Sequence, residues 1–191
     1  SAVAMQAGRE IKKTVLELGG SDPFIVLNDA NIDKASKTAI SARFFNTGQS
    51  CIAAKRFLVH EDVYDEFVHK VQMHIRNLVV GDALDEKTQI GPLAKKEFAK
   101  NIDTMVRSSI SDGANCIEGG KRKGCYYLPT LLIDVKEKMS VFKEETFGPV
   151  LCVSKIKNID DAIALANKSE YGLGGSVWTS DINLAKKIST Q

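Results

Sequence analysis

Apolar and polar positions along the chain follow two alternating patterns. Apolar runs bounded by Gly, Pro, Asn or Asp predict strands, and the run at residues 24–27 is typical of a strand buried on both faces of a parallel sheet. Between the runs, apolar residues recur at helical spacing, as at Val63, Phe67, Val71 and Ile75. Strands are predicted at residues 14–18, 24–27, 57–60, 115–120, 126–135, 150–156 and 174–179, and helices at residues 1–7, 32–45, 62–81, 98–113, 159–167 and 181–189.

This alternation of strands and helices indicates an α/β fold, a three-layer sandwich with a mostly parallel sheet. Polar residues at 28–31 supply a turn and a helix N-cap. In the helix that follows, at residues 32–45, Ala35, Ala39, Ala42 and Phe45 fall near one face. Residues 121–124 predict a hairpin or a loop, and residues 141–150 an irregular segment with a Gly-Pro corner.

Composition excludes several classes of function. The 191 residues are 43% hydrophobic and 26% charged with a net charge of +2, as in ordinary globular proteins. Basic residues are scattered, so we expect no nucleic-acid partner. No apolar run has transmembrane length, so we expect no membrane partner. Four widely spaced cysteines without CxxC or Cys/His pairing predict reduced thiols, no metal site and a cytoplasmic protein.

Cys51 has surroundings that the other cysteines lack. It follows an Asn-Thr-Gly turn in FFNTGQSCIAAKR, with small residues on both sides. Free cysteine is most often a small buried hydrophobe, and we interpret Cys116, Cys125 and Cys152 in that way. A Gly-rich turn instead lets a ligand approach the backbone. The Cys51 N–H can then donate to the oxyanion that forms when its thiol attacks a carbonyl group.

Glu17 is the candidate base for this thiol. It stands in LELGG, where Gly19-Gly20 ends the predicted strand at residues 14–18. A solvent-facing carboxylate is the simpler interpretation. In open α/β sheets, however, ligands bind at the carboxyl ends of strands, and a partly buried glutamate there can accept a proton near neutral pH.

A third candidate segment is KEETFGPV at residues 143–150. Its simpler interpretation is a charged turn before a strand. A rigid Phe-Gly-Pro corner can also present the face of Phe147, and the carboxylate of Glu145 can accept hydrogen bonds from sugar hydroxyls. Together these two side chains suit a nicotinamide riboside.

The chain resembles the aldehyde dehydrogenase superfamily in three motifs that occur in the same order: LELGG at 16–20, FFNTGQSC at 44–51 and EETFGPV at 144–150. IGPL at 90–93, YYLPTLL at 126–132 and YGLGGSVWT at 171–179 fit the same pattern, so the resemblance covers essentially the whole chain. Within the superfamily, GQSCIAAKRF is most similar to bacterial succinate-semialdehyde dehydrogenases. The resemblance implies that residues 1–191 are the catalytic domain of such an enzyme, or most of that domain.

The resemblance also implies roles for single residues. Cys51 matches the nucleophile and Glu17 the general base that activates water for deacylation. Glu145 matches the ribose-binding carboxylate, Phe147 the ring against the nicotinamide, and Gly19 a backbone element at the nicotinamide end. The implied reaction oxidises a small-molecule aldehyde to the acid with NAD or NADP, through a thiohemiacetal and a thioester on cysteine.

Parts of the family pattern have no counterpart in these residues. Both ends of the chain fall inside helical patterns, as though cut from a longer protein. The family's dinucleotide-binding domain, with its asparagine oxyanion donor, and its oligomerisation segment are not matched. We therefore expect little activity from these 191 residues alone. The resemblance also implies a homo-oligomer for the full-length protein.

One position near the thiol differs from the pattern of succinate-semialdehyde dehydrogenases. Many succinate-semialdehyde dehydrogenases carry an arginine just before the Asn-x-Gly-Gln turn, where this chain has Phe45. The resemblance implies succinate semialdehyde as the aldehyde, and the difference at Phe45 leaves an uncharged medium-chain or aromatic aldehyde as the alternative. We expect Phe45, Ser50 and Ile52 to line the aldehyde pocket.

Two other classes of function compete with this prediction. An acylating dehydrogenase would transfer the thioester to coenzyme A, but such relatives usually lack the glutamate, so Glu17 favours hydrolysis. A structural or binding protein could retain the fold without catalysis, and the joint presence of Cys51 and Glu17 argues against it.

Overall fold

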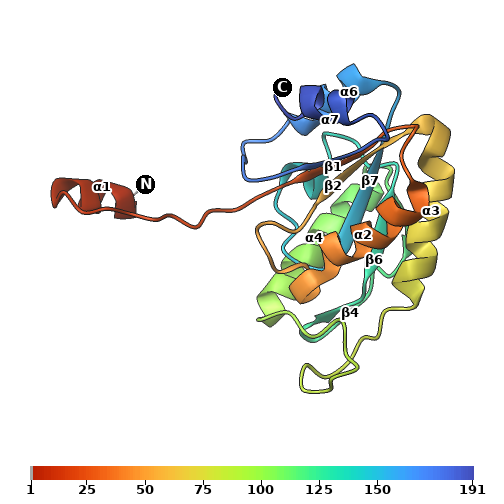
Figure 1. Ribbon diagram of the computed structural model, residues 1–191. Helices are drawn as coiled ribbons and strands as arrows, with labels where there is room; N and C mark the ends of the chain where they lie inside the picture. The colour runs from red at the N-terminus through yellow and green to blue at the C-terminus, as the bar shows by residue number, and fades with distance from the viewer. Residues whose placement is uncertain (1) are drawn as a thin grey trace.

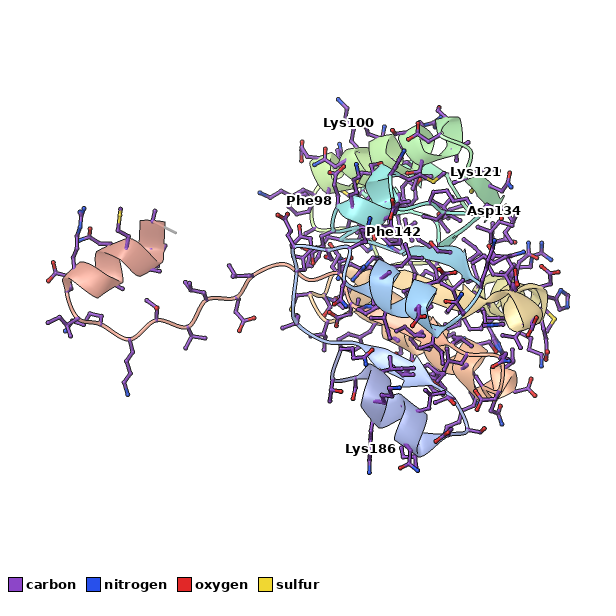
Figure 2. The ribbon with its side chains drawn as sticks, turned by 90° about the horizontal axis from the view of Figure 1, so that it is seen from above. Phe98, Lys100, Lys121, Asp134, Phe142 and Lys186 are labelled. Carbon is purple, nitrogen blue, oxygen red and sulfur yellow. The ribbon has the colours of Figure 1, made fainter. Side chains whose placement is uncertain are left out.

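The computed structural model describes residues 2–191 and consists of a body and an N-terminal arm. Helix α1 (Ala2–Arg9) stands apart from the body at the end of an extended segment, and this separation is visible in two views turned by 90° (Figures 1 and 2). The predicted helix at residues 1–7 is confirmed for the residues described, although it continues through Gly8.

The predicted strand at residues 14–18 is wrong. These residues have no regular secondary structure and are all exposed. A strand needs a neighbour to pair its N–H and C=O groups, and the arm here runs away from the sheet (Figure 1).

A six-stranded sheet forms the centre of the body, with the strand order β3-β6-β7-β2-β1-β8. All neighbouring strands pair in parallel except β3 and β6, which are antiparallel, so the predicted α/β fold with a mostly parallel sheet is confirmed. The strands of this sheet are β1 (Pro23–Val26), β2 (Arg56–His60), β3 (Asn115–Glu118), β6 (Thr130–Ile133), β7 (Val150–Ile156) and β8 (Ser176–Trp178). A separate hairpin pairs β4 (Arg122–Lys123) with β5 (Tyr126–Tyr127), which is the first of the two alternatives predicted there.

Helices cover both faces of the sheet and make two hydrophobic cores. Phe24 and Val26 point to the face covered by α2 (Ile32–Phe44) and α3 (Glu61–Arg76). Ile25 points to the opposite face, where Phe142 lies inside the body while Lys100 and Lys186 project outward (Figure 2). The helices on that second face are α4 (Lys96–Ser111), α5 (Ser140–Lys143), α6 (Ile159–Ala166) and α7 (Ile182–Ile188).

Helix ends follow local hydrogen bonding more closely than the apolar pattern. Asn31 caps α2 by accepting from Lys34 N–H, as predicted. Helix α3 begins one residue before Asp62, because the side chain of His60 accepts from Asp62 N–H, and it ends at Arg76 rather than near Gly81. None of the described helices is both long and apolar enough to cross a membrane.

Candidate active site

The three segments singled out in the sequence each lead into one of three adjacent strands. Gly19-Gly20 precede β1, Cys51 precedes β2, and residues 143–149 precede β7. Pro23 pairs with Arg56, and Arg56 with Cys152, so the amino-terminal parts of these three strands lie side by side. The three segments therefore meet at the amino edge of the sheet. The expected position at the carboxyl end of a strand is wrong, because the strand on which that expectation depended is not formed.

Cys51 follows a turn with unusual backbone conformation. After α2, the 3₁₀ turn η1 (Phe45–Gly48) has φ of 49° at Asn46, 57° at Thr47 and 74° at Gly48. Left-handed φ is costly for a β-branched residue such as Thr47. The turn is held by Gly91 N–H donating to Thr47 Oγ1 at 3.1 Å and by Asn46 Nδ2 donating to the Gln49 carbonyl at 3.0 Å.

Gly48 is fixed both by its conformation and by its surroundings. A Cβ at this position would collide with the Gly148 carbonyl. We expect Gly48→Ala to lower the free energy of unfolding by at least about 3 kcal/mol, the sum of the left-handed φ and the displaced backbone. Gly124→Ala is the matched control, because φ there is +61° but the space around it is open, and it should cost only about 1–2 kcal/mol. Denaturant unfolding measures both, and equal losses would contradict the role of the contact.

Cys51 differs from the other cysteines in its surroundings rather than in its exposure, since Cys116 and Cys125 are also half-buried. It is half-buried, and no hydrogen bond from its N–H is found within residues 2–191. Burial raises the pKa of Cys152 to about 12 and also raises the pKa of Cys116. The prediction that Cys152 is a packing residue is confirmed by its full burial.

The arm contacts the cysteine loop through Gly20. A Cβ at Gly20 would collide with the Cys51 carbonyl, and Gly20 N–H donates to Glu145 Oε1 at 3.1 Å. One glycine thus touches both of the other segments. Its missing side chain permits this approach.

An open cleft of about 490 Å³ forms where the segments meet. It is lined by Glu17, Leu18, Gly19, Gln49, Ser50, Cys51, Glu145 and Phe147. The two residues proposed to carry the chemistry, Cys51 and Glu17, therefore share one cleft with the candidate cofactor-binding residues. Glu17 is exposed there, whereas we expected it to be partly buried.

Two of the predicted pocket residues lie outside this cleft. Phe45 is 69% exposed and lines a different hollow between α2 and the end of α3, together with His74 and Leu78. Ile52 is 65% exposed and does not line the cleft. The helix ends at Phe44, so Phe45 also leaves the apolar face on which the helical spacing placed it. Ser50 does line the cleft.

Lys55 is a site residue that the sequence analysis missed. Its side chain is fully buried below the cysteine loop, and its ammonium lies 3.4 Å from Glu145 Oε1. Burial lowers its pKa, while the nearby Glu145 opposes that shift. One indication of this role is visible in the sequence, because Lys55 follows two alanines and stands just before a predicted strand. A lysine buried at such a position needs nearby hydrogen-bond acceptors.

Arg43 is the second missed residue, and it is also fully buried. Its guanidinium donates to the carbonyls of Val150 at 2.6 Å, Thr146 at 2.5 Å and Ala54 at 3.3 Å, and to that of Gly148. Burial lowers its pKa to about 10. Arg43 therefore fastens the Phe-Gly-Pro corner to α2 and to the residues after Cys51.

Arg56 has a comparable structural role. Its guanidinium donates to the carbonyls of Ser21 at 2.7 Å and Leu165 at 2.8 Å and lies 5.4 Å from the centre of the Phe142 ring. Burial lowers its pKa to about 10. Both arginines near Cys51 are thus directed into the protein rather than into the cleft.

The residues of the cleft fit a nicotinamide riboside. Glu145 Oε1 is occupied by Lys55 and Gly20, whereas Oε2 has no hydrogen-bond partner among the residues described. A Cβ at Gly19 would lie 2.6 Å from that free oxygen. Phe147 is 40% exposed beside it, so an acceptor and an aromatic face are both available to a ligand.

Comparison with known proteins identifies the family of this chain. The family model described as "Aldehyde dehydrogenase family" matches residues 1–191. The chain belongs to the aldehyde dehydrogenase family. It is 50% identical to an aldehyde dehydrogenase of Paenarthrobacter nicotinovorans over 184 residues, which cover 95% of this chain and 40% of that relative.

Other relatives within the aldehyde dehydrogenase family carry a more specific name. The chain is 45% identical to a succinate-semialdehyde dehydrogenase [NADP(+)] of Deinococcus radiodurans over 99% of its length and 40% of the relative. It superposes on the crystal structure of succinate-semialdehyde dehydrogenase from Burkholderia pseudomallei with a TM-score of 0.96 and 35% identity, covering 99% of this chain and 40% of that one. The chain thus spans about 40% of the length of these relatives.

Proposed function

We propose that this chain is the thiol-bearing catalytic domain of an NAD(P)-dependent aldehyde dehydrogenase that converts an aldehyde to the carboxylic acid through Cys51. The observation that carries the proposal is the shared cleft, in which a half-buried thiol and a carboxylate, Glu17, face the same space. Membership of the aldehyde dehydrogenase family supports it.

The first step is covalent capture of the substrate. The Cys51 thiolate attacks the aldehyde carbon, a C–S bond forms, and the carbonyl electrons move to oxygen. The N–H of Cys51 makes no hydrogen bond within the described part of the chain, so it is available to donate to this oxyanion. When bound, oxidised NAD(P) supplies the acceptor for the hydride that the thiohemiacetal carbon loses.

The second step releases the product. Glu17 takes a proton from a water molecule, and the resulting hydroxide attacks the thioester carbon. The C–S bond breaks, the carboxylic acid leaves and the Cys51 thiolate is restored. An exposed carboxylate on the arm side of the cleft suits this step, because water must reach it.

For the cofactor, we assign Glu145, Phe147 and Gly19 to the nicotinamide riboside. Glu145 Oε2 would accept from a ribose hydroxyl, and Phe147 would contact the nicotinamide ring. Gly19 has no side chain to block the space beside Glu145 Oε2. These contacts suit NAD and NADP equally, because the phosphate that distinguishes them lies at the adenosine end.

Succinate semialdehyde is the substrate that the names of the relatives suggest. We expect full-length protein to prefer it by about tenfold or more in kcat/KM over its methyl ester, which has nearly the same shape without the charge. Steady-state kinetics with both compounds makes this test. Equal values would remove the succinate proposal while leaving aldehyde oxidation intact.

An uncharged aldehyde is the second candidate, and a specific observation favours it. Arg43 and Arg56, the arginines nearest to Cys51 in sequence, are both engaged with backbone carbonyls. Neither is free to bind a distal carboxylate. A preference for succinate semialdehyde would therefore require a cation other than these two.

A further inference from the structure

Lys55 links the cysteine loop to the candidate ribose-binding carboxylate. Its ammonium donates to the carbonyls of Ser50 and Cys51 at 3.1 Å each and of Ala53 at 3.0 Å. Three acceptors within four consecutive residues close the loop around one charged group. The position of the Cys51 backbone is thereby tied to the position of this nitrogen.

The same nitrogen fixes the orientation of Glu145. Oε1 of Glu145 lies 3.4 Å from the Lys55 ammonium and accepts from Gly20 N–H at 3.1 Å. With one oxygen held from two directions, the carboxylate has little freedom to turn. Oε2 is left facing the space beside Gly19.

A purely structural role explains less of this arrangement. Three carbonyls can be satisfied by neutral donors, which avoid the cost of removing an ammonium from water. Lys55 bears that cost with a side chain that is fully buried. The carboxylate in direct contact with this charge is Glu145, which is 19% exposed and lines the cleft. Asp22 also attracts the ammonium but forms no ion pair with it.

We propose that Lys55 is a positioning residue that holds the Cys51 loop and Glu145 in a fixed spacing, so that the thiol and Glu145 Oε2 address one bound cofactor. This inference rests on the proposed function. It predicts that the effect of Lys55 on cofactor binding depends on Glu145, whereas a residue that only stabilises the fold would act independently of Glu145.

A double-mutant cycle on the full-length protein tests this dependence. The variants are Lys55→Met, Glu145→Gln and the two combined, and the readout is the Kd of reduced cofactor from fluorescence titration. We expect Lys55→Met to raise Kd about tenfold in the parent, as for loss of a charged hydrogen bond. In the Glu145→Gln background the same change should raise Kd less than about twofold.

Arg56→Met is the matched control, because it removes a buried cation from the next residue. Arg56 donates to the carbonyls of Ser21 and Leu165 and has no contact with Glu145 in the structure. We expect a lower Tm for this variant, with Kd within about twofold of the parent. A rise in Kd equal to that of Lys55→Met would overturn the proposal.

Equal effects of Lys55→Met in both backgrounds, or no effect in either, would also overturn the positioning role. If Lys55→Met does not fold, Lys55→Gln takes its place in the cycle, since its amide can still donate to the loop carbonyls without carrying charge. Parent protein that binds cofactor but oxidises no aldehyde would refute the proposed function and still permit the cycle, so the two failures are distinguishable.

Discussion

Replacement of Cys51 by alanine is expected to lower kcat for aldehyde oxidation by at least about 10⁴-fold in the full-length protein. Without the thiol there is no covalent intermediate, and the losses measured for other enzyme nucleophiles are of this size or larger. Cofactor binding should be retained, because Glu145 and Phe147 are unchanged. Spectrophotometric detection of the reduced cofactor, with cofactor binding measured in parallel, separates the two effects.

Cys125→Ala is the matched control for this experiment. Cys125 is also a half-buried free thiol, but it does not line the cleft. Its loss should leave kcat within about twofold of the parent. Thiol labelling gives an independent check, since Cys51 should react with iodoacetamide before the other cysteines. Turnover by Cys51→Ala close to that of the parent would show that the reaction does not pass through this sulfur.

Replacement of Glu17 by glutamine is expected to lower steady-state kcat by about 10²- to 10⁴-fold, the range for loss of a general base. The step affected is hydrolysis of the thioester, so hydride transfer should still occur once. Rapid mixing should therefore show a burst of reduced cofactor near one equivalent per site. Mass spectrometry of the quenched protein should find the acyl group on Cys51.

Glu10→Gln provides the control for the charge change on the arm. Glu10 is exposed on the same arm but does not line the cleft. We expect normal turnover from this variant and no accumulation of acyl-protein. If Glu17→Gln lost activity without a burst, the carboxylate would act before the thioester forms, and the assignment as deacylation base would be wrong.

Most of the sheet and helices could be predicted from the sequence, because they follow from apolar periodicity. The run at residues 150–156 forms β7 with those bounds, and residues 24–26 of the run at 24–27 lie in β1, which is buried on both faces. The segment at residues 14–18 has the same composition as a strand, yet it is extended and exposed. Composition reports the preference of a segment, whereas a strand also needs a neighbour, and that information lies elsewhere in the chain.

The candidate site was predictable in part. A turn, a glycine pair and a Phe-Gly-Pro corner each mark a loop that precedes an apolar run, and three parallel neighbouring strands bring such loops together. The buried cations were not predictable, because the sequence does not show that Lys55 and Arg43 turn inward. Their partners are mostly backbone carbonyls, which every residue possesses, so no pattern of residue types identifies them.

The carbonyl contacts of Arg43 have a consequence for any redesign of this protein. A single planar group spans the end of the thiol-bearing loop, the helix before it and the corner that carries the aromatic ring. Because this group donates hydrogen bonds to both, the Cys51 loop and the Phe-Gly-Pro corner are expected to move together rather than independently. Specificity is therefore more readily altered from the arm, whose residues at 14–18 are exposed, than from this loop or this corner.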